Sequence, residues 1–467
     1  MARVLLVQPH EDRTNEYNRR RINTPINLIV VGTAIEDKHE VKIYDRNLDI
    51  DDEKFVRFLK KYNPDIVGFT AMTSPMLFDL VHTGKIVKKI SPEVIVIVGG
   101  IHAQIDPDSL LNEPYVDYII QGEADETFLE FCDVFDKNPK KLGKLKNINH
   151  NPLRPFVDME KLKAPNYELV DLKKYGHVFV MLSRGCPGNC TFCSSTRRWG
   201  KGGIPCVREY RVEEVLKMFR NLIEKNGIKV FSIADDNFVS YADKTKKICD
   251  YLKDKKVHFF SFARADYVND QTLKMLRKAG CHTIQIGIES GSQRVLNFLN
   301  KRTTIQQNIE AIRCCKRNGI TCDASFMLGV PSETVEELNE TVRFIKKHKP
   351  ASTNAKIFNP FPGTPIFDYC INKGLIKKES LPKTLEEWAR WTGDVKLIKI
   401  EHNVSEIPSE YLFKVAQELL SYGFYKHKIK RLFYWLKAGE IKLIIKNMRN
   451  VFIHRGSLIL PFRKRTN

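Results

Sequence analysis

The chain has 467 residues, of which 42% are hydrophobic and 28% are charged, with a net charge of +20. This length exceeds what a single hydrophobic core ordinarily serves, so we expect two or three domains. No run is apolar for long enough to span a bilayer, and the first residues, MARVLLVQPHEDR, lack the apolar core and cleavage site of a signal peptide. These features indicate a cytoplasmic protein and argue against structural disulfides among its eleven cysteines.

Residues 1–136 alternate short β-branched runs with stretches of helical spacing. The runs are bounded by Gly, Pro or Asp and cover residues 4–7, 40–45, 65–70, 94–100 and 117–123. Strict alternation of strand and helix predicts a doubly wound, Rossmann-like parallel sheet of the α/β class. Such a sheet binds its ligand in the crevice beyond the carboxyl ends of the strands.

Residues 137–175 lose this periodicity and gather Pro, Lys and Asn, which predicts a linker with short elements of its own. A second alternation follows over residues 176–370. Its six strand candidates cover residues 177–183, 230–236, 259–266, 283–290, 324–330 and 355–361. Six units fall short of the eight of a closed barrel, so we expect a partial (β/α)6, TIM-like barrel with its site at the carboxyl ends of the strands.

Three cysteines, Cys186, Cys190 and Cys193, follow directly after the first strand of this second unit, in the run RGCPGNCTFC. Three thiolates on a loop at a barrel mouth can hold three irons of a cubane iron–sulfur cluster and leave the fourth iron open. Two alternatives are a zinc site completed by a distant His and three unrelated buried cysteines. The C-x3-C-x2-C spacing makes the last improbable, and no second paired knuckle supports zinc.

The run CPGNCTFC resembles the signature of the radical S-adenosylmethionine (SAM) enzymes. The resemblance implies that the three cysteines ligate a four-iron, four-sulfur (4Fe-4S) cluster and that SAM chelates the fourth iron. An electron from a donor such as flavodoxin or ferredoxin then cleaves SAM to a 5′-deoxyadenosyl radical. Residues at the strand ends are implied to bind SAM, namely Phe192, Asp235, Asp236, Arg264, Glu289 and Ser290.

Residues 1–135 resemble the cobalamin-binding domain that precedes the barrel in a large radical SAM subfamily. The resemblance implies cobalamin contacts at Asp45, Arg46, Asn47, Thr73, Ser74, Gly99, Gly100, His102, Gly122 and Glu123. Domains that ligate cobalt from below carry Asp-x-His, and here the third position is Asn47, so we expect cobalamin to be held without a lower histidine. His102, beside a Gly-Gly turn, is more typical of a hydrogen-bonding loop residue. The alternative is a degenerate domain that binds no corrin.

Residues 371–467 show no strand alternation and are predicted to form a helical, basic C-terminal region. From Ser421 onward there are twelve Lys or Arg and one acidic residue. Aromatic and aliphatic side chains at helical spacing among these charges are typical of a peripheral contact with an anionic inner-membrane surface. A helical cap on the barrel is the alternative, and clustered aliphatic residues argue against nucleic acid.

The resemblance implies methylation of an unactivated carbon, in which cobalamin carries the methyl group. A basic, aromatic tail favours a lipid, isoprenoid or tetrapyrrole as the small-molecule substrate. Alternatives are a radical oxidoreductase or cyclase of the same layout and an RNA-modifying or nucleic-acid-binding iron–sulfur protein. Methylthio-transferring relatives carry a second cysteine trio in the N-terminal domain, whereas this chain has only Cys132 there.

Overall fold

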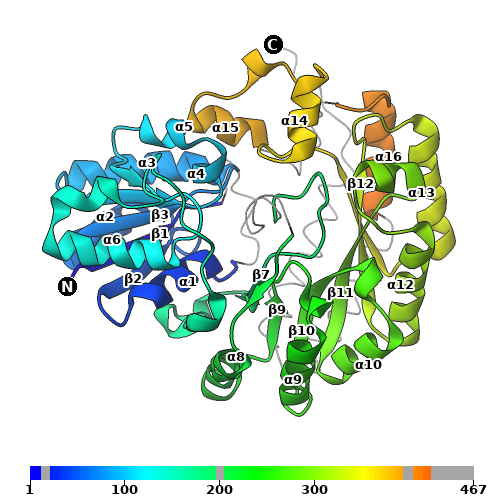
Figure 1. The fold of residues 1–467 in the computed structure, drawn as a ribbon, viewed down its shortest axis with the longest axis horizontal. Helices are drawn as coiled ribbons and strands as arrows, with labels where there is room; N and C mark the ends of the chain where they lie inside the picture. Colours follow the sequence, from blue (N-terminus) through cyan, green and yellow to red (C-terminus); the bar gives the residue numbers. More distant parts are fainter. Residues whose placement is uncertain (12–21, 196–204, 393–402, 422–467) are drawn as a thin grey trace.

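The computed structural model describes residues 1–11, 22–195, 205–392 and 403–421, and Figure 1 shows its two α/β units. The N-terminal unit is a five-stranded parallel sheet of order β2-β1-β3-β4-β5. Its strands are β1 (Arg3–Gln8), β2 (Glu40–Asp45), β3 (Ile66–Thr70), β4 (Ile95–Gly99) and β5 (Tyr118–Ile119). The prediction of a doubly wound sheet is confirmed.

Alternate side chains of these strands supply two separate cores. Leu5 and Val67 pack with helices α2 (Asp52–Tyr62) and α3 (Met76–Ile90). Leu6 and Ile97 point to the other face, where α1 (Ile26–Ile35) and α6 (Asp125–Lys137) cover them. The strands are apolar on both faces because both faces carry helices. Two short helices, α4 (His102–Ile105) and α5 (Pro107–Leu111), follow β4.

The second unit is a six-stranded sheet of order β13-β12-β11-β10-β9-β6, with every neighbouring pair parallel. The strands are β6 (Val178–Val180), β9 (Val230–Ile233), β10 (His258–Arg264), β11 (Cys281–Glu289), β12 (Thr321–Leu328) and β13 (Ser352–Ile357). Sheet order follows chain order, so β6 and β13 form the two ends, as a partial barrel requires. All six predicted strands are present.

Helices follow the barrel strands, namely α8 (Val212–Phe219), α9 (Ala242–Leu252), α10 (Asp270–Lys278), α11 (Gln293–Phe298), α12 (Ile305–Arg317), α13 (Val335–His348) and α14 (Pro365–Asn372). Those from α8 to α13 form an arc on the outside of the sheet, whereas α14 lies beside α15 (Leu385–Thr392) at the top of the view (Figure 1). Two of them begin with a complete capping box, in which Thr304 and Thr334 satisfy the first free amides of α12 and α13. This outer layer leaves the carboxyl ends of the strands for the site.

Three segments outside the two sheets pack against one unit or the other. Tyr167 and Met159, from short 3₁₀ helices in the predicted linker 137–175, are buried in the barrel core. Helix α15 (Leu385–Thr392) packs against α3 of the N-terminal unit through Leu385 and Trp388. Helix α16 (Ser409–Ser421) instead packs on β13 of the barrel. The predicted helical C-terminal region therefore contributes to both units, and its basic stretch beyond residue 421 lies outside the described residues.

A two-stranded antiparallel ribbon, which no pattern in the sequence predicts, flanks the cysteine loop with one strand before it and one after it. It pairs β7 (Ser183–Arg184) with β8 (Arg208–Glu209), two residues each.

Among the helices of the described ranges, none is both long and apolar enough to cross a bilayer.

Candidate functional site

The cysteine loop begins where β7 ends, at the carboxyl end of the first barrel strand. It carries the three predicted cluster ligands, Cys186, Cys190 and Cys193. Gly185 has a φ of +96°, a conformation that glycine adopts without strain. The backbone N–H groups of Gly188 and Ser195 point at the Sγ atoms of Cys186 and Cys193, each at 3.4 Å. Amides directed at sulfur stabilise negative charge there, as cluster thiolates need.

Two later segments of the barrel hold this loop in place. The side-chain amide of Asn300 donates to the carbonyl of Asn189 at 2.6 Å. The N–H of Thr191 donates to Leu299, and its carbonyl accepts from Ile366 at the start of α14. The loop is therefore fixed at its centre by contacts from residues more than a hundred positions away.

Two buried cations face Cys190. The Arg264 guanidinium donates to the Cys190 Sγ at 3.5 Å and to both carboxylate oxygens of Asp266 at 3.0 Å. The Lys301 ammonium, also buried, pairs with Glu289 at 2.8 Å. Burial raises the pKa of the Cys186 thiol, and the nearby Arg264 charge partly opposes this effect. The arrangement satisfies Arg264 and Glu289 within the chain, and their predicted SAM contacts remain predictions.

Asp235 and Asp236, predicted together, lie in different surroundings. Asp235 is fully buried and accepts hydrogen bonds from the Leu182 amide and the hydroxyls of Ser183 and Tyr241. Burial raises the pKa of Asp235 to about 6, against the lowering effect of these hydrogen bonds. Its carboxylate fixes the end of β6, whereas Asp236 lies nearer the cysteine loop.

The other predicted SAM contacts are Asp236, Ser290 and Phe192. Asp236, only partly buried, accepts from the Ser195 hydroxyl at 2.5 Å. The Ser290 hydroxyl lies 3.1 Å from that of Thr341 and is buried. Phe192 packs against an apolar cluster that includes side chains of α14. The structure gathers all six around the mouth of the barrel, and their roles toward SAM stay predictions.

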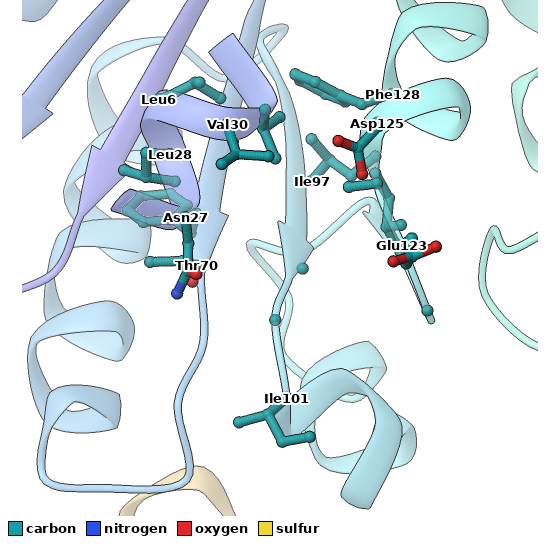
Figure 2. Close-up of a pocket in the computed structure, with 18 of the residues that line it drawn as sticks. Leu6, Asn27, Leu28, Val30, Thr70, Ile97, Ile101, Glu123, Asp125 and Phe128 are labelled. Carbon is teal, nitrogen blue, oxygen red and sulfur yellow. The ribbon is translucent and has the colours of Figure 1, made fainter. Parts of the chain in front are cut away.

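A cavity of about 140 Å³ opens at the carboxyl ends of the N-terminal strands. Figure 2 shows its apolar part, where Leu28 and Val30 of α1 face Ile97 and Phe128 across the gap. Its lining includes four predicted cobalamin contacts, Gly99, Gly100, Gly122 and Glu123, and two barrel residues, Met181 and Arg184. The cavity therefore extends from the Rossmann-like core to the strand that leads into the cysteine loop.

The two glycines at the end of β4, Gly99 and Gly100, differ in the space around them. A Cβ on Gly99 would meet nothing closer than 3.9 Å, so this position faces open space in the cavity. Gly100 has a φ of +103°, and a Cβ there would lie 2.6 Å from the Ala71 carbonyl oxygen. Gly100 is thus required by the packing of two strand ends, whereas Gly99 leaves room for a ligand.

The remaining predicted cobalamin contacts are absent from the cavity lining. Arg46 is fully buried and pairs with Asp52 at 2.6 Å and with Asp79 at 3.4 Å. The Asp45 carboxylate accepts from the backbone and side-chain nitrogens of Asn47 at 2.9 and 3.0 Å. These bonds close the turn after β2. The lining also lacks Thr73 and Ser74, which lie in the loop after β3. It lacks His102 too, which is the first residue of α4.

His102 is a buried hydrogen-bonding residue. Its ring nitrogens lie 3.0 Å from the hydroxyls of Thr73 and Ser109, and its ring meets Trp388 of α15 edge-on. Burial lowers the pKa of His102 to about 4, so the ring is neutral at physiological pH. It joins the loops after β3 and β4 to the C-terminal helix.

This burial predicts a pH dependence of stability. Below pH 6.5 the unfolded chain protonates His102, whereas the folded chain resists protonation down to about pH 4. The free energy of unfolding should therefore fall by about 3 kcal/mol as the pH falls through this window. Urea denaturation of the wild type and His102→Gln at pH 7 and pH 4 checks this, and an equal acid loss in both proteins would contradict it.

The three thiols fit a cluster better than a single zinc ion. Within the residues the structure describes, no three His, Cys, Asp or Glu side chains converge closely enough to hold one metal ion. Thiolates of a cubane ligate separate irons and stand farther apart than the ligands of one zinc. Burial raises the pKa of Cys193 to about 12, so ligation there must release a proton.

Two family models match the chain. It matches the family model of the Radical SAM superfamily over residues 180–345 and that of the B12 binding domain over residues 18–131. An uncharacterized methyltransferase from Pyrococcus horikoshii is 32% identical to it over 89% of this chain and 91% of the relative. The chain belongs to the radical SAM superfamily. Membership implies that its cofactors are a 4Fe-4S cluster and SAM, and the match to the B12 binding domain adds cobalamin.

Two further proteins are similar to this one. The anaerobic magnesium-protoporphyrin IX monomethyl ester cyclase of Rubrivivax gelatinosus is 28% identical, over 68% of this chain and 60% of the relative. The radical SAM methyltransferase TsrM from Kitasatospora setae, solved with cobalamin and a [4Fe-4S] cluster, superposes with a TM-score of 0.67. The superposition covers 84% of this chain and 82% of TsrM at 18% identity, and it confirms the fold.

Four residues at this site had no signal in the sequence that we could interpret. Lys301 and Asp125 sit in ordinary charged runs, and Arg184 and Arg208 flank the cysteine loop without a motif of their own. All four are buried or partly buried ion-pair partners. Burial of a charge depends on a partner distant in the chain, so local patterns do not reveal it.

Proposed function

We propose that this radical SAM protein is a cobalamin-dependent methyltransferase that acts on an unactivated carbon. The observation that carries the proposal is the shared cavity, which contains Gly99 of the B12-binding unit and Arg184, two residues before Cys186. When bound, the cluster and SAM supply a hydrogen-abstracting radical, and cobalamin supplies the methyl group. The relative from Pyrococcus horikoshii, named as a methyltransferase, supports this assignment.

The chain's own residues perform binding and positioning in this scheme. Cys186, Cys190 and Cys193 would ligate the cluster, with Arg264 and Lys301 balancing its negative charge. The apolar part of the cavity, beside Gly99, would bind the aromatic end of the corrin's nucleotide tail. A lower histidine ligand is not available at Asn47, whose amide is bonded to Asp45 and Pro9. The lower face of the corrin would therefore be held without a side chain from this turn.

A radical cyclase is the second candidate, because the relative from Rubrivivax gelatinosus carries that name. Anaerobic incubation of the reconstituted protein with methyl-labelled SAM and a cell lipid extract separates the two. We expect labelled methyl groups in a lipid, isoprenoid or tetrapyrrole fraction by mass spectrometry. Consumption of SAM to 5′-deoxyadenosine, with an unlabelled product altered in hydrogen content, would favour the cyclase.

The partners we propose are a small lipophilic substrate and a one-electron donor such as flavodoxin or ferredoxin. A peripheral membrane contact would come from the stretch beyond residue 421, where Leu432, Phe433, Trp435 and Leu436 cluster among basic residues. Further aliphatic residues follow at Ile441, Leu443, Ile444 and Ile445. Aliphatic groups in that number bury in acyl chains and gain little from stacking on bases.

We predict that the protein co-sediments with anionic liposomes and that removing residues 425–467 abolishes this. Binding should weaken with salt, because part of it is electrostatic. RNA at equal charge should not compete. Saturable RNA binding at physiological salt would contradict the prediction, and unfolding of the truncated protein would show that the segment is a cap on the barrel.

A further inference from the structure

A buried ion-pair network joins the two units beside the cavity. The Arg184 guanidinium donates to Glu123 at 2.8 Å and to both carboxylate oxygens of Asp125 at 2.8 Å. Arg184 comes from β7 of the barrel, whereas Glu123 and Asp125 precede and begin α6 of the N-terminal unit. The three side chains are no more than 5% exposed. A fork that binds a carboxylate through two parallel bonds fixes both distance and orientation.

A second arginine completes the network. Arg208 lies opposite Arg184 in the β7–β8 ribbon. Its two terminal nitrogens donate hydrogen bonds to the Glu123 carboxylate at 2.8 and 2.9 Å. Glu123 also accepts the Val157 amide at 2.8 Å, and the Phe156 ring lies 4.5 Å from the Arg208 guanidinium. Two guanidinium groups thus face two carboxylates, and the buried charge is balanced. Balanced buried pairs contribute little net stability but favour one specific arrangement of the groups.

The position of Arg184 gives this arrangement a consequence for the site. Its side chain lines the cavity together with Glu123 and Asp125. Its backbone lies two residues before Cys186, the first ligand on the cysteine loop. Figure 2 shows Glu123 and Asp125 on the side of the cavity opposite α1. A shift of the Arg184 fork would therefore move the cysteine loop relative to the cavity.

We propose that Arg184 is a positioning residue that sets the separation between the cluster and the corrin. The proposal rests on the function proposed above, because it assigns both cofactors to this cavity and loop. Reactions between positioned groups lose about a hundredfold in rate from a displacement of 1 Å. The network would hold the radical source and the methyl carrier at a spacing that couples SAM cleavage to methyl transfer.

The test compares Arg184→Lys with Arg317→Lys. Lysine keeps the charge but loses the two-pronged geometry. Arg317 pairs with Asp270 on the outer helices of the barrel and serves as the matched control. In the protein loaded with cob(II)alamin and with the cluster in its one-electron-reduced, paramagnetic [4Fe-4S]+ state, pulsed EPR measures the separation of the two paramagnetic centres. We expect a broadened or shifted distance distribution for Arg184→Lys and a wild-type distribution for Arg317→Lys.

Product analysis supplies the second readout. The ratio of 5′-deoxyadenosine to methylated product should rise about tenfold or more in Arg184→Lys at unchanged iron and corrin content. Asp125→Asn, which keeps the side-chain size, repeats the test if the lysine variant does not fold. An unchanged distance distribution and ratio in a folded, merely less stable variant would overturn the proposal. A wild type that binds corrin without forming methylated product would refute the methyltransferase and leave the distance test intact.

Discussion

Changing Cys190 to alanine is expected to remove the cluster and abolish SAM cleavage, not merely slow it. Cys190 is the buried central ligand, and its Sγ accepts a hydrogen bond from Arg264. With one of three thiolates lost, the cluster becomes labile, and Arg264 keeps only its pairing with Asp266 and the Lys301 carbonyl. Anaerobically reconstituted wild type should carry about four irons per chain. The variant should lose this iron and the broad thiolate-to-iron absorbance, and it should form no 5′-deoxyadenosine.

Cys249 offers a matched control, because it is equally buried but lies on α9, away from the loop. Cys249→Ala should cost about 1 kcal/mol of stability and keep the full iron content. Cys186→Ala and Cys193→Ala should behave like Cys190→Ala. Iron retained by any loop variant, or zinc without iron in oxygen-free wild type, would contradict the assignment of these ligands.

Changing Gly99 to phenylalanine is expected to block cobalamin binding while the fold survives. Open space surrounds the position where a Cβ would be added, so the new ring would enter the cavity. A phenyl ring in the volume that the corrin must occupy excludes it sterically, so the variant should show no saturable binding of hydroxocobalamin. The variant should keep its cluster and cleave SAM without transferring methyl groups. Spectroscopic titration measures the corrin bound.

The control is Gly143→Phe, on an exposed 3₁₀ helix where a Cβ meets only Tyr118 at 3.7 Å. It should bind corrin like the wild type. Gly100 is unsuitable as a comparison, because a side chain there would collide with Ala71 and disturb the loop itself. Equal corrin affinity in Gly99→Phe and wild type would show that cobalamin does not use this cavity, and the cyclase would become the better assignment.

The fold was predictable because its strands are strongly patterned. Strands such as Ile66–Thr70 and Ile95–Gly99 are buried on both faces, so they appear as continuous β-branched runs. The β7–β8 ribbon was missed because two residues per strand carry no periodicity. The core packing of Tyr167 was missed for a different reason. A 3₁₀ turn in a Pro- and Lys-rich stretch resembles a linker until its partners in the barrel are known.

The site was predictable only where spacing carries the chemistry. The three cysteines lie within eight residues, so their sequence alone indicates the cluster. Resemblance also led us to expect cobalamin contacts at Arg46 and His102. Within the chain these residues bind Asp79 and the hydroxyls of Thr73 and Ser109, and their contacts with cobalamin stay predictions. Arg184 shows the converse. Its carboxylate partners lie about sixty positions earlier, so the chain offers no local sign that its charge is buried.

The most direct test of the account is whether the cluster loop and the cavity serve one reaction. Reconstituted protein is incubated without oxygen with hydroxocobalamin, a reductant and methyl-labelled SAM, and the corrin fraction is then separated. We predict label in the corrin of wild type and Gly143→Phe, and none in that of Gly99→Phe. A wild-type chain that cleaves SAM to 5′-deoxyadenosine but binds no corrin, or leaves its corrin unlabelled, would contradict the account.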